Sequence, residues 1–386
     1  MIPYGRQDID DADVAAVTEV MRSDYLTQGP VVPRFEKAVA AYCGAAHAVA
    51  VNSATSGLHI ACLALGLGPG QRLWTSPMTF AASANCGLYC GANVDFVDVD
   101  PASLNMDPVA LAEKLERAKA SNTLPHVIVV VHFTGESADM VKISALARDY
   151  DVKIIEDASH AIGGTYEGKP VGSCLHSDIC VFSFHPVKII TTAEGGMCLT
   201  NNAALARRMQ MLRSHGITRE AGELEYEAGP WHYEQQLLGF NYRMTDLHAA
   251  LGLSQMQRLD AFVARRHELF ENYCKALKGL PLWLPAESPN SSSAHHLYVV
   301  RIFPDDPQPP RRRVFEQLRN RGIGVNVHYI PVHLHPYYRS LGFRPGQFPV
   351  AENYYVGAMT LPLFPSMSAR DAGRVVSEAG MSLKPA

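Results

Sequence analysis

Short apolar runs alternate with segments of helical periodicity through the first 200 residues. The apolar runs have the length and the β-branched content of buried strands. They lie at residues 47–51, 73–76, 94–99, 127–133, 152–155, 179–182 and 197–200. Helical patterns separate several of them, at residues 58–67, 107–118 and 140–150. Because strands that alternate with helices usually form parallel sheets, the pattern predicts an α/β fold with a large, mostly parallel sheet.

The pattern changes after residue 240. A single long helix is predicted from about Asp246 to Leu277, and loops rich in Pro and Ser follow at 281–293 and 304–310. A strand at 296–303, a helix at 312–321 and a strand at 324–329 then predict a smaller α/β unit. We therefore expect residues 1–250 to form an N-terminal arm and a large domain, and residues 251–386 to form the connecting helix and a small C-terminal domain.

Composition narrows the class of protein. With 386 residues and 47% hydrophobic content the chain can bury a large core. A net charge of −4, from 34 basic and 38 acidic residues, argues against nucleic-acid binding. The longest apolar strand, 127–131, is too short to cross a membrane, and the first ten residues do not resemble a secretory signal. The eight cysteines are typical of reduced thiols, so we expect a cytoplasmic enzyme.

Two sets of residues could bind a metal ion. Cys86 and Cys90 could share one helix face, and His333 and His335 would point to the same side of an extended segment. The cysteines have no second pair, and neither a cysteine nor a carboxylate lies close to the histidines. We therefore predict no metal site.

The segment that contains Lys188 carries the chemistry. It connects the predicted strands 179–182 and 197–200. Desolvation beside a core favours the neutral amine of a lysine, which can then attack a carbonyl cofactor such as pyridoxal phosphate to form a Schiff base. Taken alone, a loop lysine is far more often a solvated surface charge than a nucleophile. The interpretation therefore depends on the other residues of the chain.

Other candidate residues follow predicted strands. The turn at 52–57 precedes a helix, so its hydroxyl groups and free N–H groups could bind a phosphate or could simply cap the helix. Phe80 could stack on a planar ring or belong to the core. Asp157 ends an apolar strand and could pair with a cationic ring nitrogen or cap a helix, and His160 is close enough to share that pocket.

Four motifs together resemble one family over nearly the whole chain. They are Asn52–Gly57, Glu156–Ala161, Ser183–Lys188 with Glu194–Gly196, and Asn241–Met244. In this order they resemble the DegT/DnrJ/EryC1/StrS sugar aminotransferases, which have the type I pyridoxal-phosphate transferase fold of aspartate aminotransferase and act as homodimers with shared active sites. The resemblance implies that Lys188 binds pyridoxal 5′-phosphate covalently and that Asp157 contacts its ring nitrogen. It also implies cofactor contacts by Thr55, Ser56, Phe80, His160, Ser183 and, from the partner subunit, Asn241. Many relatives have Gln where this chain has His160.

A narrower resemblance concerns the substrate. Tyr25–Gly29, Phe184–Gly196, Arg213–Gly216 and Val327–Pro331 resemble the family members that aminate C4 of a UDP-linked 4-keto-6-deoxy-N-acetylhexosamine in pseudaminic acid biosynthesis. L-glutamate would then supply the nitrogen. The implied contacts with the sugar nucleotide come from Tyr4, Tyr25, Leu26, Thr27, His328 and Tyr329.

Three alternatives remain open at this point. The acceptor could be a different nucleotide-linked 3- or 4-keto sugar. Dehydratases of the family have His in place of the lysine, and Lys188 argues against that activity. The chain could also be a regulatory relative without catalysis, although it retains both Lys188 and Asp157.

Overall fold

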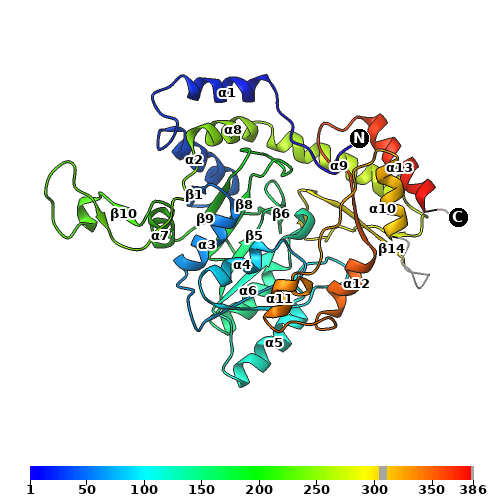
Figure 1. Ribbon diagram of the computed structural model, residues 1–386, viewed down its shortest axis with the longest axis horizontal. Helices are drawn as coiled ribbons and strands as arrows, with labels where there is room; N and C mark the ends of the chain where they lie inside the picture. The colour runs from blue at the N-terminus through cyan, green and yellow to red at the C-terminus, as the bar shows by residue number, and fades with distance from the viewer. Residues whose placement is uncertain (304–310, 384–386) are drawn as a thin grey trace.

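A seven-stranded sheet forms the centre of the molecule (Figure 1). The computed structural model describes residues 1–303 and 311–383. The strand order is β1-β9-β8-β5-β4-β2-β3. The bounds are β1 His47–Val51, β2 Arg72–Thr75, β3 Asn93–Phe96, β4 Val127–Val131, β5 Lys153–Asp157, β8 Ile179–Ser183 and β9 Gly196–Thr200. The five strands from β8 to β3 are parallel, whereas β9 and β1 run antiparallel to their neighbours, so the predicted mostly parallel sheet is confirmed.

Successive side chains of the central strands enter different cores, as the two-residue period of a strand requires. In β4, Val127 and Val129 pack under the helices of one face, and Ile128 and Val130 pack under those of the other. The first face is covered by α3 Ala54–Ala64, α4 Ala82–Tyr89 and α7 Ala203–Arg213. The second is covered by α2 Val31–Cys43, α5 Pro108–Ala120, α6 Met140–Asp149 and α8 Asp246–Met256. Both faces are thus closed to water, as a parallel sheet needs.

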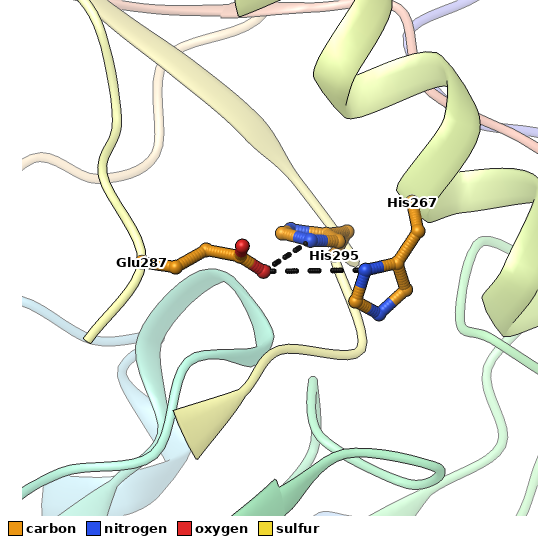
Figure 2. Close-up of side chains that lie close together, drawn as sticks. All are labelled: His267, Glu287 and His295. Carbon is orange, nitrogen blue, oxygen red and sulfur yellow. Dashed lines mark ion pairs between the residues drawn. The ribbon is translucent and has the colours of Figure 1, made fainter. Parts of the chain in front are cut away.

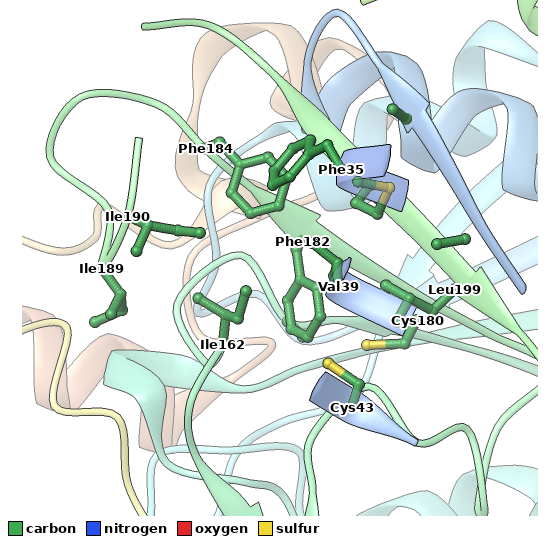
Figure 3. Packing of buried hydrophobic residues seen from close by; sticks show 14 of the residues in the cluster. Phe35, Val39, Cys43, Ile162, Cys180, Phe182, Phe184, Ile189, Ile190 and Leu199 are labelled. Carbon is green, nitrogen blue, oxygen red and sulfur yellow. The ribbon is translucent and has the colours of Figure 1, made fainter. Parts of the chain in front are cut away.

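The core on the α2 side supports the segment that contains Lys188. Figure 3 shows Phe35 and Val39 of α2 beside Phe182 and Phe184, with the rings of Phe35 and Phe184 5.3 Å apart. Ile189 and Ile190 directly follow Lys188 and are also buried in this cluster. The apolar side chains around Lys188 therefore fix the backbone that carries it.

A second unit, which we call the small lobe, is built on the sheet β12-β14-β15. Its elements are α9 Leu259–Ala276, β12 Leu282–Trp283, β14 Tyr298–Ile302, α10 Arg311–Asn320, β15 Ala358–Leu361 and α13 Ala369–Ser382. These elements share one apolar core, which also includes Ile2 from the N-terminus. A further cluster joins the two units; it contains Phe96 of β3 and Met78 from the segment after β2, together with Val299 of β14 and Tyr354 of α12 (Pro349–Gly357). The segment between β12 and β14 thus runs along their boundary.

The remaining elements are short or peripheral. They are α1 Asp11–Met21, α11 Pro336–Ser340, α12 Pro349–Gly357, the 3₁₀ turns η1 Phe133–Gly135, η2 Ala221–Glu223 and η3 Val332–Leu334, and the two-residue strands β6 Thr165–Tyr166, β7 Lys169–Pro170, β10 Ile217–Thr218, β11 Glu234–Gln235 and β13 Ser291–Ser292. Figure 1 shows the β10 region projecting from the body beside α7. None of the helices within 1–303 and 311–383 has both the length and the hydropathy needed to traverse a lipid bilayer.

Two predicted elements were wrong. The single helix expected from Asp246 to Leu277 is two helices, α8 and α9, which are separated near Arg258. Arg258 forms ion pairs with Asp8, Asp10 and Asp13 of the N-terminal arm, and these contacts hold the chain where the two helices meet. The strand expected at 324–329 is reduced to a bridge between Asn326 and Thr360.

Two other predictions, a loop at 304–310 and a domain boundary at residue 250, are not tested by the observed elements. The loop expected at 304–310 lies outside the described residues. The division of the chain at residue 250 stays a proposal, and that residue lies within α8.

Candidate active site

A cavity of about 510 Å³ opens at the carboxyl ends of the parallel strands. Val131 of β4, Asp157 of β5 and Ser183 of β8 line its floor. The first turn of α3 and the segment with Lys188 line its sides, and the small lobe and the N-terminal arm supply the rest of the wall. Ligands in open α/β sheets bind at this edge, where loops can supply polar groups over a rigid base.

The carboxylate of Asp157 is held in one orientation by two serine side chains. Ser83 Oγ donates to Oδ2 at 2.6 Å, and Ser159 donates to Oδ1 from Oγ at 2.5 Å and from its backbone N–H at 3.1 Å. Asp157 is 5% exposed and lines the cavity. A buried carboxylate supported in this way stabilises a positive charge placed against it, such as a protonated ring nitrogen.

Lys188 lines the same cavity as Asp157. Burial lowers the pKa of its ammonium group to about 8, and the negative charge of Asp157 opposes this shift. Within the described parts of the chain its amine forms no hydrogen bond or ion pair, so it is free to react. A substantial fraction of Lys188 is therefore a neutral nucleophile near pH 8.

The N-terminus of α3 forms the end of the cavity that suits an anion. Ser53 caps the helix by accepting from the backbone N–H of Ser56 at 3.1 Å, and Ala54 and Thr55 of the first turn line the cavity. Gly196 lies against this turn, because a Cβ added to it would be 2.6 Å from the backbone N of Ala54. The free N–H groups and the helix dipole can bind a phosphate here.

Neutral histidines form the opposite wall. Burial lowers the pKa of His160 and His296 well below the usual value, and it lowers the pKa of His328 to about 3. The His160 and His296 rings are 4.5 Å apart, and His160 Nε2 is 3.2 Å from the hydroxyl of Tyr329. Nδ1 of His160 and of His296 is buried without a hydrogen-bond partner in the described structure. These nitrogens remain available to a bound molecule.

Most of the predicted site residues meet in this cavity. Its lining includes Tyr4, Thr55, Phe80, Asp157, His160, Ser183, Lys188, His328 and Tyr329. Phe80 is 63% exposed, which disfavours its interpretation as a core residue. Its side chain is available to stack on a planar ring that enters the cavity.

Five predicted residues lie outside the lining of this chain's cavity. Ser56 Oγ instead lies 3.0 Å from Ser53 Oγ within the helix cap. Asn241 is exposed and forms a bridge with Ser214. Tyr25 and Leu26 are exposed, and Thr27 pairs with Thr245. The roles expected of these five residues remain predictions.

Several residues of the site were not predicted from the sequence. Ser83 reaches Asp157 from α4, 74 positions away in the chain, and His296 and Asn326 enter from the small lobe. Pattern analysis could not find them, because their role depends on tertiary contact. Ser159 could have been found, since it lies two positions after Asp157 in the same motif.

The residues of the cavity fit pyridoxal phosphate, because a chemically suitable group is present for its ring nitrogen, its phosphate and its aldehyde. Asp157 matches the ring nitrogen, the α3 N-terminus matches the phosphate, and Lys188 matches the aldehyde carbon. The fit rests on the supported carboxylate, the free helix N–H groups and the partly neutral amine.

Comparison with known proteins agrees with this fit. A family model described as the DegT/DnrJ/EryC1/StrS aminotransferase family matches residues 7–379. Spore coat polysaccharide biosynthesis protein SpsC of Bacillus subtilis is 40% identical over 378 residues, which cover 97% of this chain and 95% of that protein. UDP-4-amino-4,6-dideoxy-N-acetyl-beta-L-altrosamine transaminase of Campylobacter jejuni is 38% identical over 373 residues, with 96% and 95% covered. The solved structure of Helicobacter pylori PseC, an aminotransferase involved in the biosynthesis of pseudoaminic acid, superposes with a TM-score of 0.89 at 29% identity, covering 99% of each chain. The chain therefore belongs to the DegT/DnrJ/EryC1/StrS family of pyridoxal-phosphate-dependent sugar aminotransferases.

Proposed function

We propose that this enzyme transfers an amino group from L-glutamate to C4 of a UDP-linked 4-keto-6-deoxy-N-acetylhexosamine, giving UDP-4-amino-4,6-dideoxy-N-acetyl-beta-L-altrosamine in pseudaminic acid biosynthesis. The observation that carries the proposal is the placement of Lys188 and Asp157 in one cavity at the strand ends. Likeness to the Campylobacter jejuni transaminase over 96% of the chain supports the choice of sugar.

The chemistry divides between the cofactor and the protein. When bound, pyridoxal phosphate supplies an electron sink that makes the α-hydrogen of an amino acid acidic. Asp157 keeps the ring nitrogen protonated, because its carboxylate is fixed by Ser83 and Ser159. The amine of Lys188 would accept the α-proton of the amino acid, a role for which a pKa of about 8 suits it. Phe80, which lines the cavity, would cover one face of the ring.

The wall opposite the sheet is suited to a neutral, polar sugar. Tyr4, Asn326, His328 and Tyr329 present hydroxyl, amide and imidazole groups to the cavity, and the low pKa of His328 keeps its ring uncharged at neutral pH. Neutral hydrogen-bond donors and acceptors can bind the hydroxyl and acetamido groups of a sugar, which carry no charge. The histidines and Tyr329 therefore suit the hydroxyl and acetamido groups of the sugar acceptor.

We further propose that two copies of the chain in the cytoplasm share their active sites. Asn241 is exposed and lies outside its own cavity, so a contact with the cofactor needs a second chain. Exposed apolar residues gather in the nearby projecting region around β10, namely Tyr226, Trp231, Tyr233 and Leu238. Such a surface is costly in water and would be covered by a partner. Mixed dimers of Lys188→Ala and Asn241→Ala chains test this point, because one site in each would regain activity.

A spectroscopic titration tests the substrates. The purified enzyme with bound pyridoxal phosphate is treated with L-glutamate, and the visible band of the lysine-bound cofactor should disappear. The UDP-linked 4-keto-6-deoxy-N-acetylhexosamine should then restore it, while dTDP- and GDP-linked keto sugars should not. Lys188→Ala should show neither change. Restoration by a different nucleotide sugar would disprove the proposed acceptor and keep the aminotransferase, whereas no response to any amino donor would favour a relative without catalysis.

A further inference from the structure

Three side chains from separate segments converge beside the boundary between the two units (Figure 2). His267 comes from α9, Glu287 from the loop before β13, and His295 from the segment that follows β13. Their ligand atoms all lie within 4.8 Å of one another. Glu287 Oε1 is 2.9 Å from His295 Nε2 and 4.0 Å from His267 Nδ1. The group lies outside the lining of the cofactor cavity.

His295 is held firmly, and its Nε2 faces the carboxylate of Glu287. The residue is 2% exposed, and its ring stacks on Phe270 with the centroids 3.8 Å apart. Glu287 Oε1 lies 2.9 Å from Nε2 and forms an ion pair with the protonated ring, while the neutral ring's Nε2 has no hydrogen-bond partner among the described residues. A buried polar atom without a partner is costly, and such an atom in a native protein usually has an unseen one. Here that atom is directed into a group of other metal-ligand atoms.

We propose that His267, Glu287 and His295 bind a divalent transition-metal ion of the Zn²⁺ type. Two imidazoles and one carboxylate are a donor set that Zn²⁺ accepts, with water as the fourth ligand. Hard cations such as Mg²⁺ prefer six oxygen ligands and would not be retained. Nothing in the proposed aminotransferase chemistry requires this site, so it is independent of that proposal.

Only small movements are needed to form the coordination. Zn–N and Zn–O bonds of about 2.0–2.1 Å place tetrahedral ligand atoms about 3.4 Å apart. The pair at 2.9 Å must therefore open slightly, the pair at 4.0 Å must close slightly, and the two imidazole nitrogens, which lie within 4.8 Å of each other, must also come to about 3.4 Å. His267 and Glu287 have side chains that are 29% and 42% exposed, so they can adjust around the fixed ring of His295. The partly exposed side of the group also gives the ion a route of entry.

One nearby charge opposes binding. Arg266 is fully buried next to His267 and donates from Nη1 to the backbone carbonyls of His295 and His296. Its positive charge repels a cation, and Glu287 is the carboxylate that offsets it within the group. We therefore expect micromolar affinity, weaker than that of a structural zinc site with thiolate ligands.

A metal ion bound at this position would affect the cofactor cavity through the backbone that joins His295 to His296. His295 precedes His296, which lines the cavity and contacts His160. An ion that joins α9 to this segment would limit the movement of His296. The site is thus a place where metal ions could alter the enzyme without contacting substrate.

Zn²⁺ binding by the holoenzyme, measured by competition with a chromophoric chelator, tests the proposal. Wild-type protein should bind one Zn²⁺ ion. The dissociation constant for Zn²⁺ should be at least tenfold higher in His267→Gln and in Glu287→Gln. His47→Gln, on the edge strand β1, and Glu268→Gln, beside His267 on α9, make the same chemical changes outside the group and should bind as the wild type does. Mg²⁺ should not compete.

Crystallography with Zn²⁺ locates the ion independently of any substitution. Anomalous scattering from soaked wild-type crystals should give a peak within about 2.3 Å of all three ligand atoms. This measurement decides the matter if a variant fails to fold, which circular dichroism would reveal. Equal Zn²⁺ affinity in all five proteins, no binding by the wild type, or anomalous peaks only at other histidines would each disprove the site.

Discussion

The ionisation of Lys188 can be measured before any cofactor is added. Burial lowers the pKa of its amine to about 8, against an ordinary value of 10.5. At pH 7.5 the neutral fraction is then about one quarter rather than about one in a thousand, a difference of roughly 3 kcal/mol in the cost of deprotonation. The apoenzyme should therefore contain a reactive amine at neutral pH. The sign follows from desolvation, which penalises the charged form of a lysine.

Competitive labelling provides the assay. Apoenzyme is methylated with trace formaldehyde and a mild reductant between pH 6 and 11, and mass spectrometry follows the peptide that contains Lys188. The exposed Lys169 in the same digest is the internal reference. Labelling of Lys188 should rise with pH to a midpoint near 8 and then level off.

Replacement of Asp157 makes the test sharper. The carboxylate favours the charged lysine and so raises its pKa, against the effect of burial. Asp157→Asn should consequently move the labelling midpoint of Lys188 below that of the wild type. A wild-type midpoint near the ordinary value of about 10.5 would refute the argument from burial. A higher midpoint in Asp157→Asn would refute the assignment of Asp157 as the opposing charge.

Two other predictions concern the groups that support the site. Ser159→Ala removes the 2.5 Å hydrogen bond from Ser159 Oγ to Asp157. A hydrogen bond to a charged group contributes about 1.5–3 kcal/mol, so the affinity for pyridoxal phosphate, measured by equilibrium dialysis, should fall about tenfold or more. Ser340→Ala, far along the chain on α11, is the control, and equal affinity in both variants would contradict the role given to Ser159. Asp246→Ala removes a fully buried carboxylate that accepts hydrogen bonds from the backbone N–H groups of Gly29, Val31 and Val32. The free energy of unfolding, measured in urea, should therefore fall by about 3 kcal/mol. Asp11→Ala, at an exposed carboxylate, is the control and should change the free energy of unfolding little. A similar small change in the free energy of unfolding of both variants would show that these N–H groups form hydrogen bonds to water in place of Asp246.

The parts of the fold that repeat a short pattern could be predicted from the sequence. The parallel strands were found because each is a compact apolar run; β8 was placed to within one residue, and β4 was predicted two residues too long. The helix α2 was not predicted, because Val31–Cys43 follows a Gly-Pro turn without a clear start signal. The interruption between α8 and α9 was also missed, since it depends on contacts of Arg258 with an arm that lies more than 240 residues earlier.

The site divides in the same way. Asp157, Ser183 and Thr55 could be predicted because each lies at the end of a strand or the start of a helix, where the fold itself brings polar groups together. Ser83 and His296 could not, because only packing brings them to Asp157 and His160. His267, Glu287 and His295 were missed for a similar reason, since no spacing in the chain links a helix residue to a loop 20 positions later.

Arg266 explains why the small lobe can form part of the cavity at all. Its guanidinium group is fully buried and donates to the carbonyls of His295, His296 and Leu363. Burial lowers its pKa to about 9, so the group still carries its charge at pH 7. Because charged donors form stronger hydrogen bonds than neutral ones, one side chain of α9 holds all three carbonyls in place. The position of His296 in the cavity therefore depends on a cation that contacts no ligand, and any ion bound at His267 and His295 would act on the same segment.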